Sequence, residues 1–171
     1  MKFVPLSKFL STIPSPKGVV VTNAPPCAQI GGAILRKGGT AVDAAIAAML
    51  SEGVAAPNTM GVGGGFIMTI YKKDTGVVHT LDSREVAPLA ATEDMFGSDT
   101  NLCTRGGLSA AVPGELKGYW EVYQKHGGAV PWKDLLQPSI DLCKNGVPIS
   151  TFVKRIAALD VEVLSNDEGL K

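Results

Sequence analysis

The pattern of apolar and polar positions predicts short strands alternating with longer helices. A β-branched run at Gly18–Thr22 is typical of a short buried strand. The apolar spacing over Cys27–Lys37 predicts a helix that ends at a pair of glycines. Thr40 and Asp43 then form a start that resembles a capping box, with aspartate in place of the usual glutamate. Because the helix that follows is almost wholly small or apolar, we expect it to be buried on all sides.

A β-hairpin is predicted in the middle of the chain. Phe66–Lys73 and Val77–Ser83 have strand-like composition, and the three residues between them end in Gly76, which suits a turn position with positive φ. A polar surface loop is expected over residues 98–107. It is followed by a further short strand at Leu108–Val112, so the sheet should have three or four strands.

Three helices are predicted after this strand. Pro113 should lie in the first turn of a helix that continues through His126. The second helix, Pro131–Lys144, contains Pro138, which predicts either a kink or two short helices. The third is expected at Ser150–Leu164. This order of elements indicates an α+β fold with helices packed on a sheet, and the small number of strands suggests that the sheet is incomplete in this chain.

Composition is consistent with one globular domain. Residues 1–17 contain three prolines and are expected to form an irregular lead-in, so the domain is predicted over 18–171. Apolar residues make up 45% of the chain, and 16 basic residues balance 16 acidic ones. Zero net charge argues against a nucleic-acid partner, which requires a basic surface. The longest apolar stretch is shorter than the ~20 residues of a membrane span, and the first residues lack the apolar segment of a signal peptide.

The sequence predicts neither a metal site nor a cofactor site. Three cysteines cannot all pair within the chain, and none forms a CxxC motif. His79 and His126 are far apart in the sequence and have no cysteine nearby. The glycine run at Gly61–Phe66 lacks the Gly-Lys-Ser/Thr end of a Walker loop, and it precedes a strand rather than a helix. We therefore interpret this run as a place where a helix and a strand pack closely.

Arg84 is the candidate binding residue. It follows the second strand of the hairpin and comes shortly after the glycine run. A guanidinium group can hold a carboxylate by two parallel hydrogen bonds, which favours a small carboxylate-bearing ligand. The alternative is an arginine paired with its own acidic neighbours at the surface. The residues show no GxSxG elbow and no evident Ser-His-Asp set, so no catalytic residue is predicted. His126, at the end of a helix, is expected to be structural.

Five segments stand out by their order and spacing: Gly38–Ala47, Met60–Phe66, Ser83–Pro88, Gly106–Glu115 and Gln137–Ile140. Taken together, they resemble the large subunit of the gamma-glutamyltranspeptidase family. The resemblance covers roughly residues 17–165. It implies an N-terminal-nucleophile hydrolase with an αββα sandwich, present here only as an incomplete fragment. In that family a precursor cleaves itself, and the new N-terminal threonine of the small subunit is the nucleophile, with its own amine as base.

The resemblance also implies an activity and a site. The family transfers the glutamyl group of glutathione or another gamma-glutamyl compound to water or to an acceptor amino acid or dipeptide. Arg84 matches the arginine that binds the glutamyl α-carboxylate, and Glu85 would hold Arg84 in place. The catalytic threonine and the other glutamate-binding groups would lie in a small subunit that this chain lacks. The 171-residue chain alone is therefore expected to be inactive.

Location, cysteine state and alternative functions follow from the same resemblance. Family members imply the extracellular face of the plasma membrane, although no anchor or signal peptide is visible. Many extracellular animal members have a cysteine at the position of Ser51 that pairs with the equivalent of Cys27, so Cys27 is expected to be free. One alternative is a short noncatalytic relative that binds small amino acids or a partner subunit. Another is a related acylase that acts on a different amide.

Overall fold

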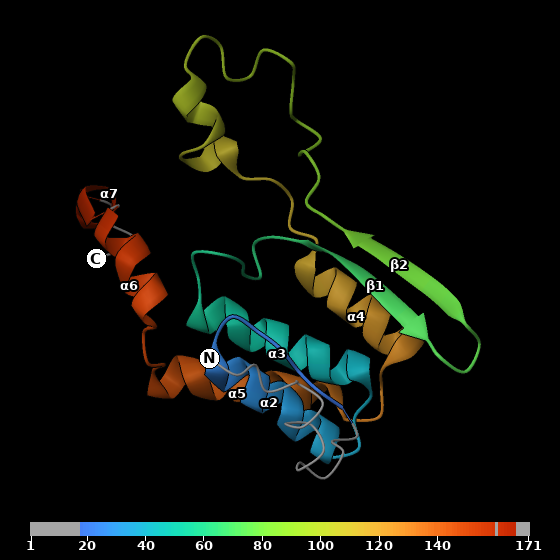
Figure 1. Ribbon diagram of the computed structural model, residues 1–171. Coiled ribbons are helices and arrows are strands. Elements are labelled where there is room, and N and C mark those ends of the chain that lie inside the picture. The colour runs from blue at the N-terminus through green and yellow to red at the C-terminus, as the bar shows by residue number, and fades with distance from the viewer. Residues whose placement is uncertain (1–17, 160, 167–171) are drawn as a thin grey trace, which may run out of the picture.

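The computed structural model describes residues 18–159 and 161–166, so the lead-in expected at 1–17 lies outside the described residues. Figure 1 shows α2, α3 and α5 side by side, with α4 between this group and a β-hairpin. The segment between β2 and α4 projects away from the helices, as do α6 and α7. The elements are α2 (Pro25–Arg36), α3 (Ala41–Ala55), β1 (Phe66–Lys72), β2 (Val77–Ser83), η1 (Thr100–Cys103), η2 (Gly107–Ser109), α4 (Glu115–His126), α5 (Trp132–Asn145), α6 (Thr151–Leu159) and α7 (Val161–Asn166).

Helix α3 is the central element, and it begins as predicted. Thr40 is the N-cap: its Oγ1 accepts a hydrogen bond from the Asp43 N–H at 3.0 Å, and Asp43 Oδ2 accepts one from the Thr40 N–H at 2.9 Å. This reciprocal pair satisfies two backbone donors that a helix start otherwise leaves free. Because α3 contacts α2, α4 and α5, residues around its whole circumference are buried, which confirms the predicted all-round burial.

The hydrophobic core lies where α3, α4 and α5 meet the first strand. Ile46 of α3, Tyr119 of α4 and Leu135 of α5 are each fully buried. The ring of Phe66, at the start of β1, stacks on Tyr119 with their centroids 4.8 Å apart. This stacked pair joins the strand to α4 and so positions the end of the hairpin relative to that helix.

The hairpin has the predicted turn and strands. β1 and β2 pair antiparallel from Phe66↔Ser83 to Lys72↔Val77, and Gly76 in the turn has φ = +69°. Gly76 therefore occupies the left-handed region that the turn requires. Ile67 and Tyr71 alternate with inward residues along β1 and are both 63% exposed, so one face of the hairpin is uncovered among the described residues.

Two of the predicted strands are wrong. Residues 18–22 have no regular secondary structure and pair with no strand in the described chain; Val20 packs on the core, while Val21 is 87% exposed. The segment 108–112 instead continues from η2 and makes only an isolated bridge between Val86 and Val112. A strand needs a partner for its backbone groups, and a β-branched run alone does not provide one. The sheet of the described residues thus has two strands rather than three or four.

The three later helices form with changed boundaries. Pro113 precedes the N-cap Gly114 instead of lying in the first turn of α4. α5 is one helix that includes Pro138, so of the two predicted alternatives the division into two short helices is wrong. The last predicted helix is present as α6 and α7, with residue 160 between them outside the description. Within the described ranges, no helix combines the length and apolarity needed to cross a bilayer.

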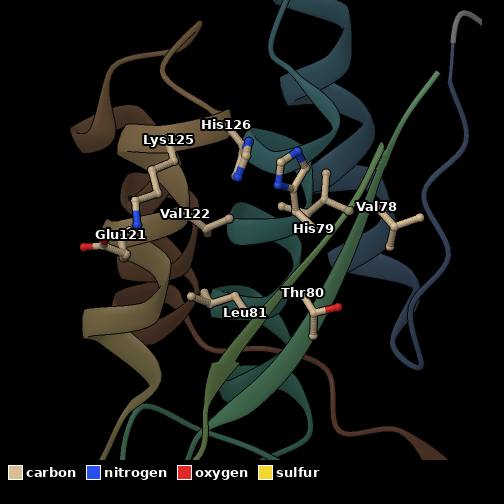
Figure 2. A pocket seen from close by; sticks show the side chains of 9 residues that line it. Val78, His79, Thr80, Leu81, Glu121, Val122, Lys125 and His126 are labelled. Carbon is tan, nitrogen blue, oxygen red and sulfur yellow. Dashed lines mark ion pairs between the residues drawn. The ribbon is translucent and has the colours of Figure 1, made fainter. Parts of the chain in front are cut away.

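The packing of β2 against α4 brings two distant histidines together. His79 lies on β2 and His126 is the last residue of α4, and their ring centroids are 4.7 Å apart. Figure 2 shows the two rings facing one another between the strand and the helix. Two histidines that are far apart in the sequence are therefore neighbours in space, because long-range packing decides that distance.

Candidate functional site

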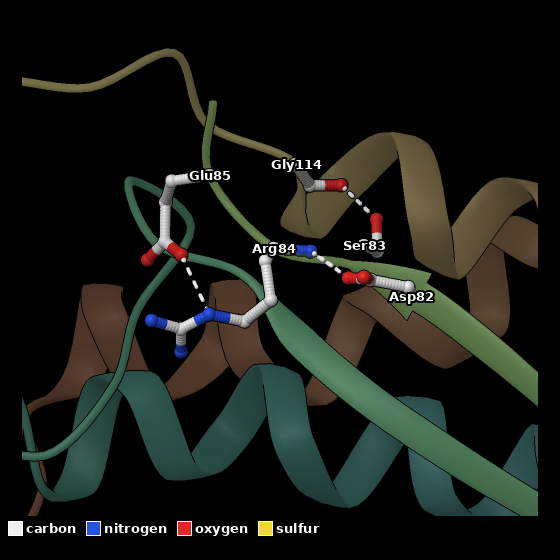
Figure 3. A network of polar contacts seen from close by, with 5 residues as sticks. All are labelled: Asp82, Ser83, Arg84, Glu85 and Gly114. Atoms are coloured by element: carbon white, nitrogen blue, oxygen red, sulfur yellow. Dashed lines mark hydrogen bonds and ion pairs between the residues drawn. The ribbon is translucent and has the colours of Figure 1, made fainter. Parts of the chain in front are cut away.

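The end of β2 fixes the backbone at Arg84. Ser83, the last strand residue, donates from its Oγ to the carbonyl oxygen of Gly114 at 2.7 Å. The Arg84 N–H donates to Asp82 Oδ1 at 3.0 Å. Figure 3 shows both bonds at the point where the strand meets the start of α4. The strand end is thus held both by the Asp82 side chain and by the start of α4, and Arg84 projects from a fixed position.

The Arg84 side chain is paired with its neighbour and is open to solvent. Its Nε lies 3.3 Å from Glu85 Oε2, and the two side chains are 62% and 25% exposed. The alternative interpretation of Arg84, an arginine paired with an adjacent acid, is therefore present in the structure. Among the described residues, no hydrogen bond or ion pair reaches the two terminal guanidinium nitrogens. An exposed pair of this kind contributes only about 0–1 kcal/mol, so it does not prevent those nitrogens from binding a ligand.

An open hollow lies beside the guanidinium group. It has a volume of about 380 Å³ and is bounded on one side by Arg84 and Glu85 and on the other by the glycine run. The loop Pro57–Met60 and the side chain of Glu115 complete its wall. The structure therefore brings the two features singled out in the sequence, the arginine and the glycines, to the same site.

The glycine run serves close packing, as predicted. A Cβ on Gly65 would stand 2.9 Å from the Cα of Arg84 and closer still to the carbonyl oxygen of Ser83. The carbonyl oxygen of Gly64 accepts hydrogen bonds from the N–H groups of Gly114 and Glu115, at 3.0 and 3.1 Å. These donors belong to the start of α4, where a helix leaves its first N–H groups unpaired. Glycine lets the loop approach closely enough to cap the helix.

Glu115 is a site residue that the sequence reasoning missed. It is only 2% exposed, and its Oε1 accepts a hydrogen bond from the Tyr119 hydroxyl at 2.6 Å. Burial raises the pKa of Glu115, the Tyr119 hydrogen bond opposes that effect, and the nearby Glu85 charge adds to it. A glutamate in the first turn of a helix usually indicates a favourable charge at the helix N-terminus. Only the tertiary structure shows that this one is buried beside the hollow.

The hollow has groups for binding and orientation. Arg84 offers a cation, while Glu85 and Glu115 offer carboxyl groups to its wall. The Thr59 hydroxyl, also at the wall, donates to the Ala56 carbonyl oxygen at 2.9 Å. No three His, Cys, Asp or Glu side chains in the described parts of the chain gather as a metal cluster. The hollow therefore combines one cation with two carboxyl groups.

Cys27 has the environment expected of a free thiol. It is fully buried, and the three cysteines are free in the structure. Burial raises the pKa of the Cys27 thiol, and a hydrogen bond with Ser51 has the opposite, smaller effect. Ser51 also donates to the carbonyl oxygens of Ala47 and Ala48, at 3.0 and 2.8 Å. Ser51 is therefore the neighbour of Cys27, and its hydroxyl is accommodated within helix α3.

Comparisons with known proteins agree on one family. The family model described as Gamma-glutamyltranspeptidase matches residues 27–171. Scoloptoxin SSD14 of Scolopendra dehaani is 46% identical over 79% of this chain and 23% of its own length. Glutathione hydrolase 3 of Arabidopsis thaliana is 35% identical over 97% of this chain and 26% of its own length.

Solved structures show the same similarity in three dimensions. The crystal structure of Helicobacter pylori gamma-glutamyltranspeptidase superposes with a TM-score of 0.84 at 31% identity, over 90% of this chain and 45% of that chain. The described residues therefore have part of the N-terminal-nucleophile hydrolase fold, as expected from the sequence. The chain spans about a quarter of the length of these curated relatives and under half of this solved chain.

Proposed function

Because the chain belongs to the gamma-glutamyltranspeptidase family, we propose that it forms the carboxylate-binding part of a gamma-glutamyltransferase and glutathione hydrolase. The observation that carries this proposal is the position of Arg84. Its terminal nitrogens have no partner among the described residues, and it lies at the edge of the glycine-lined hollow. A planar guanidinium fork matches the geometry of the glutamyl α-carboxylate, which it would hold bidentately.

Binding at Arg84 would orient the substrate for acyl transfer. With the α-carboxylate fixed, the γ-carbonyl carbon is held at a set distance from the nucleophile, which lowers the entropic part of the barrier. A threonine Oγ then attacks this carbon, the amide C–N bond breaks, and the threonine proton passes through the threonine α-amine to the leaving amine. Water or an acceptor amine next attacks the glutamyl ester and releases the threonine.

The proposal assigns the threonine to a small subunit outside these 171 residues. The described chain contributes binding and orientation, and it is inactive without that partner. Glutathione or another gamma-glutamyl compound is the proposed substrate. On family grounds we place the whole protein at the extracellular face of the plasma membrane.

Substitution of Arg84 in the full-length, processed protein tests this proposal. Arg84→Ala removes a charged, bidentate contact, whose loss costs about 2–4 kcal/mol. We expect kcat/KM for a gamma-glutamyl anilide to fall by about 30- to 700-fold, since each 1.4 kcal/mol is about tenfold. Arg84→Lys keeps the charge without the planar fork and should give an intermediate loss.

Arg105→Ala is the matched control, because Arg105 is an exposed arginine in the projecting segment between η1 and η2. It should leave kcat/KM unchanged. Circular dichroism should show that each variant retains its helical content. If Arg84→Ala retains the kcat/KM of the unaltered enzyme, Arg84 is a structural surface residue and the proposed site is wrong.

A further inference from the structure

The only two histidines of this sequence meet at one place, away from the glycine-lined hollow. His79 comes from β2 and His126 from the C-terminal end of α4. Their ring centroids are 4.7 Å apart and their planes are inclined by 46°. Figure 2 shows both rings at a cavity between the strand and the helix, together with Glu121 and Lys125 of α4. This cavity has a volume of about 350 Å³.

One nitrogen of the two histidines is left without a partner. His126 Nδ1 is buried, and no hydrogen bond reaches it within the described structure. The two imidazoles are therefore in ring contact without a hydrogen bond through that atom. Buried polar atoms in proteins are nearly always satisfied by protein, by ordered water or by an ion. An orphaned imidazole nitrogen beside a second imidazole points to a ligand that accepts electron pairs.

We propose that His79 and His126 form a two-imidazole binding site for a divalent transition-metal ion such as Zn²⁺, Cu²⁺ or Ni²⁺. Imidazole nitrogen suits these ions, whereas Mg²⁺ and Ca²⁺ prefer oxygen. With metal–nitrogen bonds of about 2.0–2.1 Å, a metal lies about 3.2 Å from the centre of each ring that ligates it, so two such rings at bond angles of about 90–110° have centres about 4.5–5.2 Å apart. The observed 4.7 Å lies in that interval.

Charges of both signs surround the site. Lys125 lines the cavity, but its ammonium group is 2.6 Å from Glu121 Oε1, so its charge is offset. His126 ends a helix of 12 residues, where the helix dipole favours positive charge. Burial, followed by the charges of His79, Lys72 and Lys125, lowers the pKa of His126. A metal binds the neutral form of an imidazole ring.

The site also has a structural consequence. At the other end of the same contact, the Ser83–Gly114 hydrogen bond joins the end of β2 to the start of α4. A metal bound by both histidines would join the opposite ends of these elements. Because the described chain provides only two ligands of this kind there, solvent would complete the coordination, and we expect weaker binding than at a four-ligand structural zinc site.

The two histidines can be observed directly by NMR of the 171-residue chain, prepared without a histidine tag. Cys103→Ser and Cys143→Ser remove the two exposed thiols, which would otherwise compete for the metal. We expect equimolar Zn²⁺ to shift the ring nitrogens of both histidines together and to raise the unfolding midpoint, while Mg²⁺ does neither. His79→Gln or His126→Gln should weaken Zn²⁺ binding about tenfold or more.

Thr80→Ala is the matched control, because Thr80 lines the same cavity without carrying a charge or belonging to the proposed ligand pair; it should retain binding. Three outcomes would overturn the site. Zn²⁺ could leave both rings unshifted, it could shift only one, or binding could survive His79→Gln. A response of the two rings to phosphate but not to Zn²⁺ would also overturn it and would indicate an anion instead. None of these outcomes depends on gamma-glutamyl transfer.

Discussion

The strongest prediction about stability concerns Asp43, because its buried carboxylate joins two distant parts of the chain. Its side chain is fully buried. Besides closing the capping box with Thr40, Asp43 Oδ1 accepts a hydrogen bond from the Gly128 N–H at 2.8 Å, and Oδ2 accepts one from the Ala129 N–H at 3.1 Å. Gly128 has φ = +87°, so the loop between α4 and α5 takes a conformation suited to glycine.

Asp43→Ala removes the acceptor of three backbone donors. A hydrogen bond to a charged group contributes about 1.5–3 kcal/mol, although such values do not add fully when the loop can relax toward water. We therefore expect Asp43→Ala to lower the free energy of unfolding by about 3–5 kcal/mol, which is a large share of the roughly 5–15 kcal/mol of a typical domain. Thr40→Ala breaks only the local cap and should cost about 1 kcal/mol.

Urea unfolding followed by circular dichroism and by tryptophan fluorescence would measure both losses. The comparison requires that the dependence of the free energy on urea stay the same in each variant. Asp74→Ala, in the exposed hairpin turn, is the control and should change the free energy by less than about 0.5 kcal/mol. If Asp43→Ala and Thr40→Ala are equally destabilising, the hydrogen bonds to Gly128 and Ala129 contribute nothing, and the reasoning is refuted.

Two further predictions concern buried ionisable groups. Because the native pKa of Glu115 is raised above its ordinary value of 4.5, its contribution to stability should be complete below that value and should be lost as the pH rises through the native pKa. Glu115→Gln should abolish this part of the pH dependence in urea titrations at several pH values; an unchanged profile would show that Glu115 titrates normally. In native conditions a thiol reagent should label Cys103 and Cys143, which are exposed, and should reach the buried Cys27 only after unfolding. Labelling of all three at equal rates, followed by mass spectrometry, would contradict the burial of Cys27.

Much of the candidate site was predictable because its signals are local. Arg84 stood out since a permanent cation follows a strand and comes shortly after a glycine run. The structure places both at one hollow. Glu115 was not predictable, because a glutamate at a helix start looks the same in sequence whether it is exposed or buried. The His79–His126 contact was also missed, since nothing in the sequence gives the packing of β2 on α4.

The sequence by itself determined the elements whose causes lie within a few residues. The capping box at Thr40 and Asp43, the positive φ of Gly76 and the helix ends at glycine pairs are set by neighbouring backbone groups, so they could be read in order along the chain. Tertiary structure decided what depends on a distant partner. Among the described residues it left Gly18–Thr22 without a strand to pair with, and it gave the Asp43 carboxylate its second role at the loop before α5. Burial and pairing are properties of neighbours in space, and a residue acquires those neighbours only when the chain has folded.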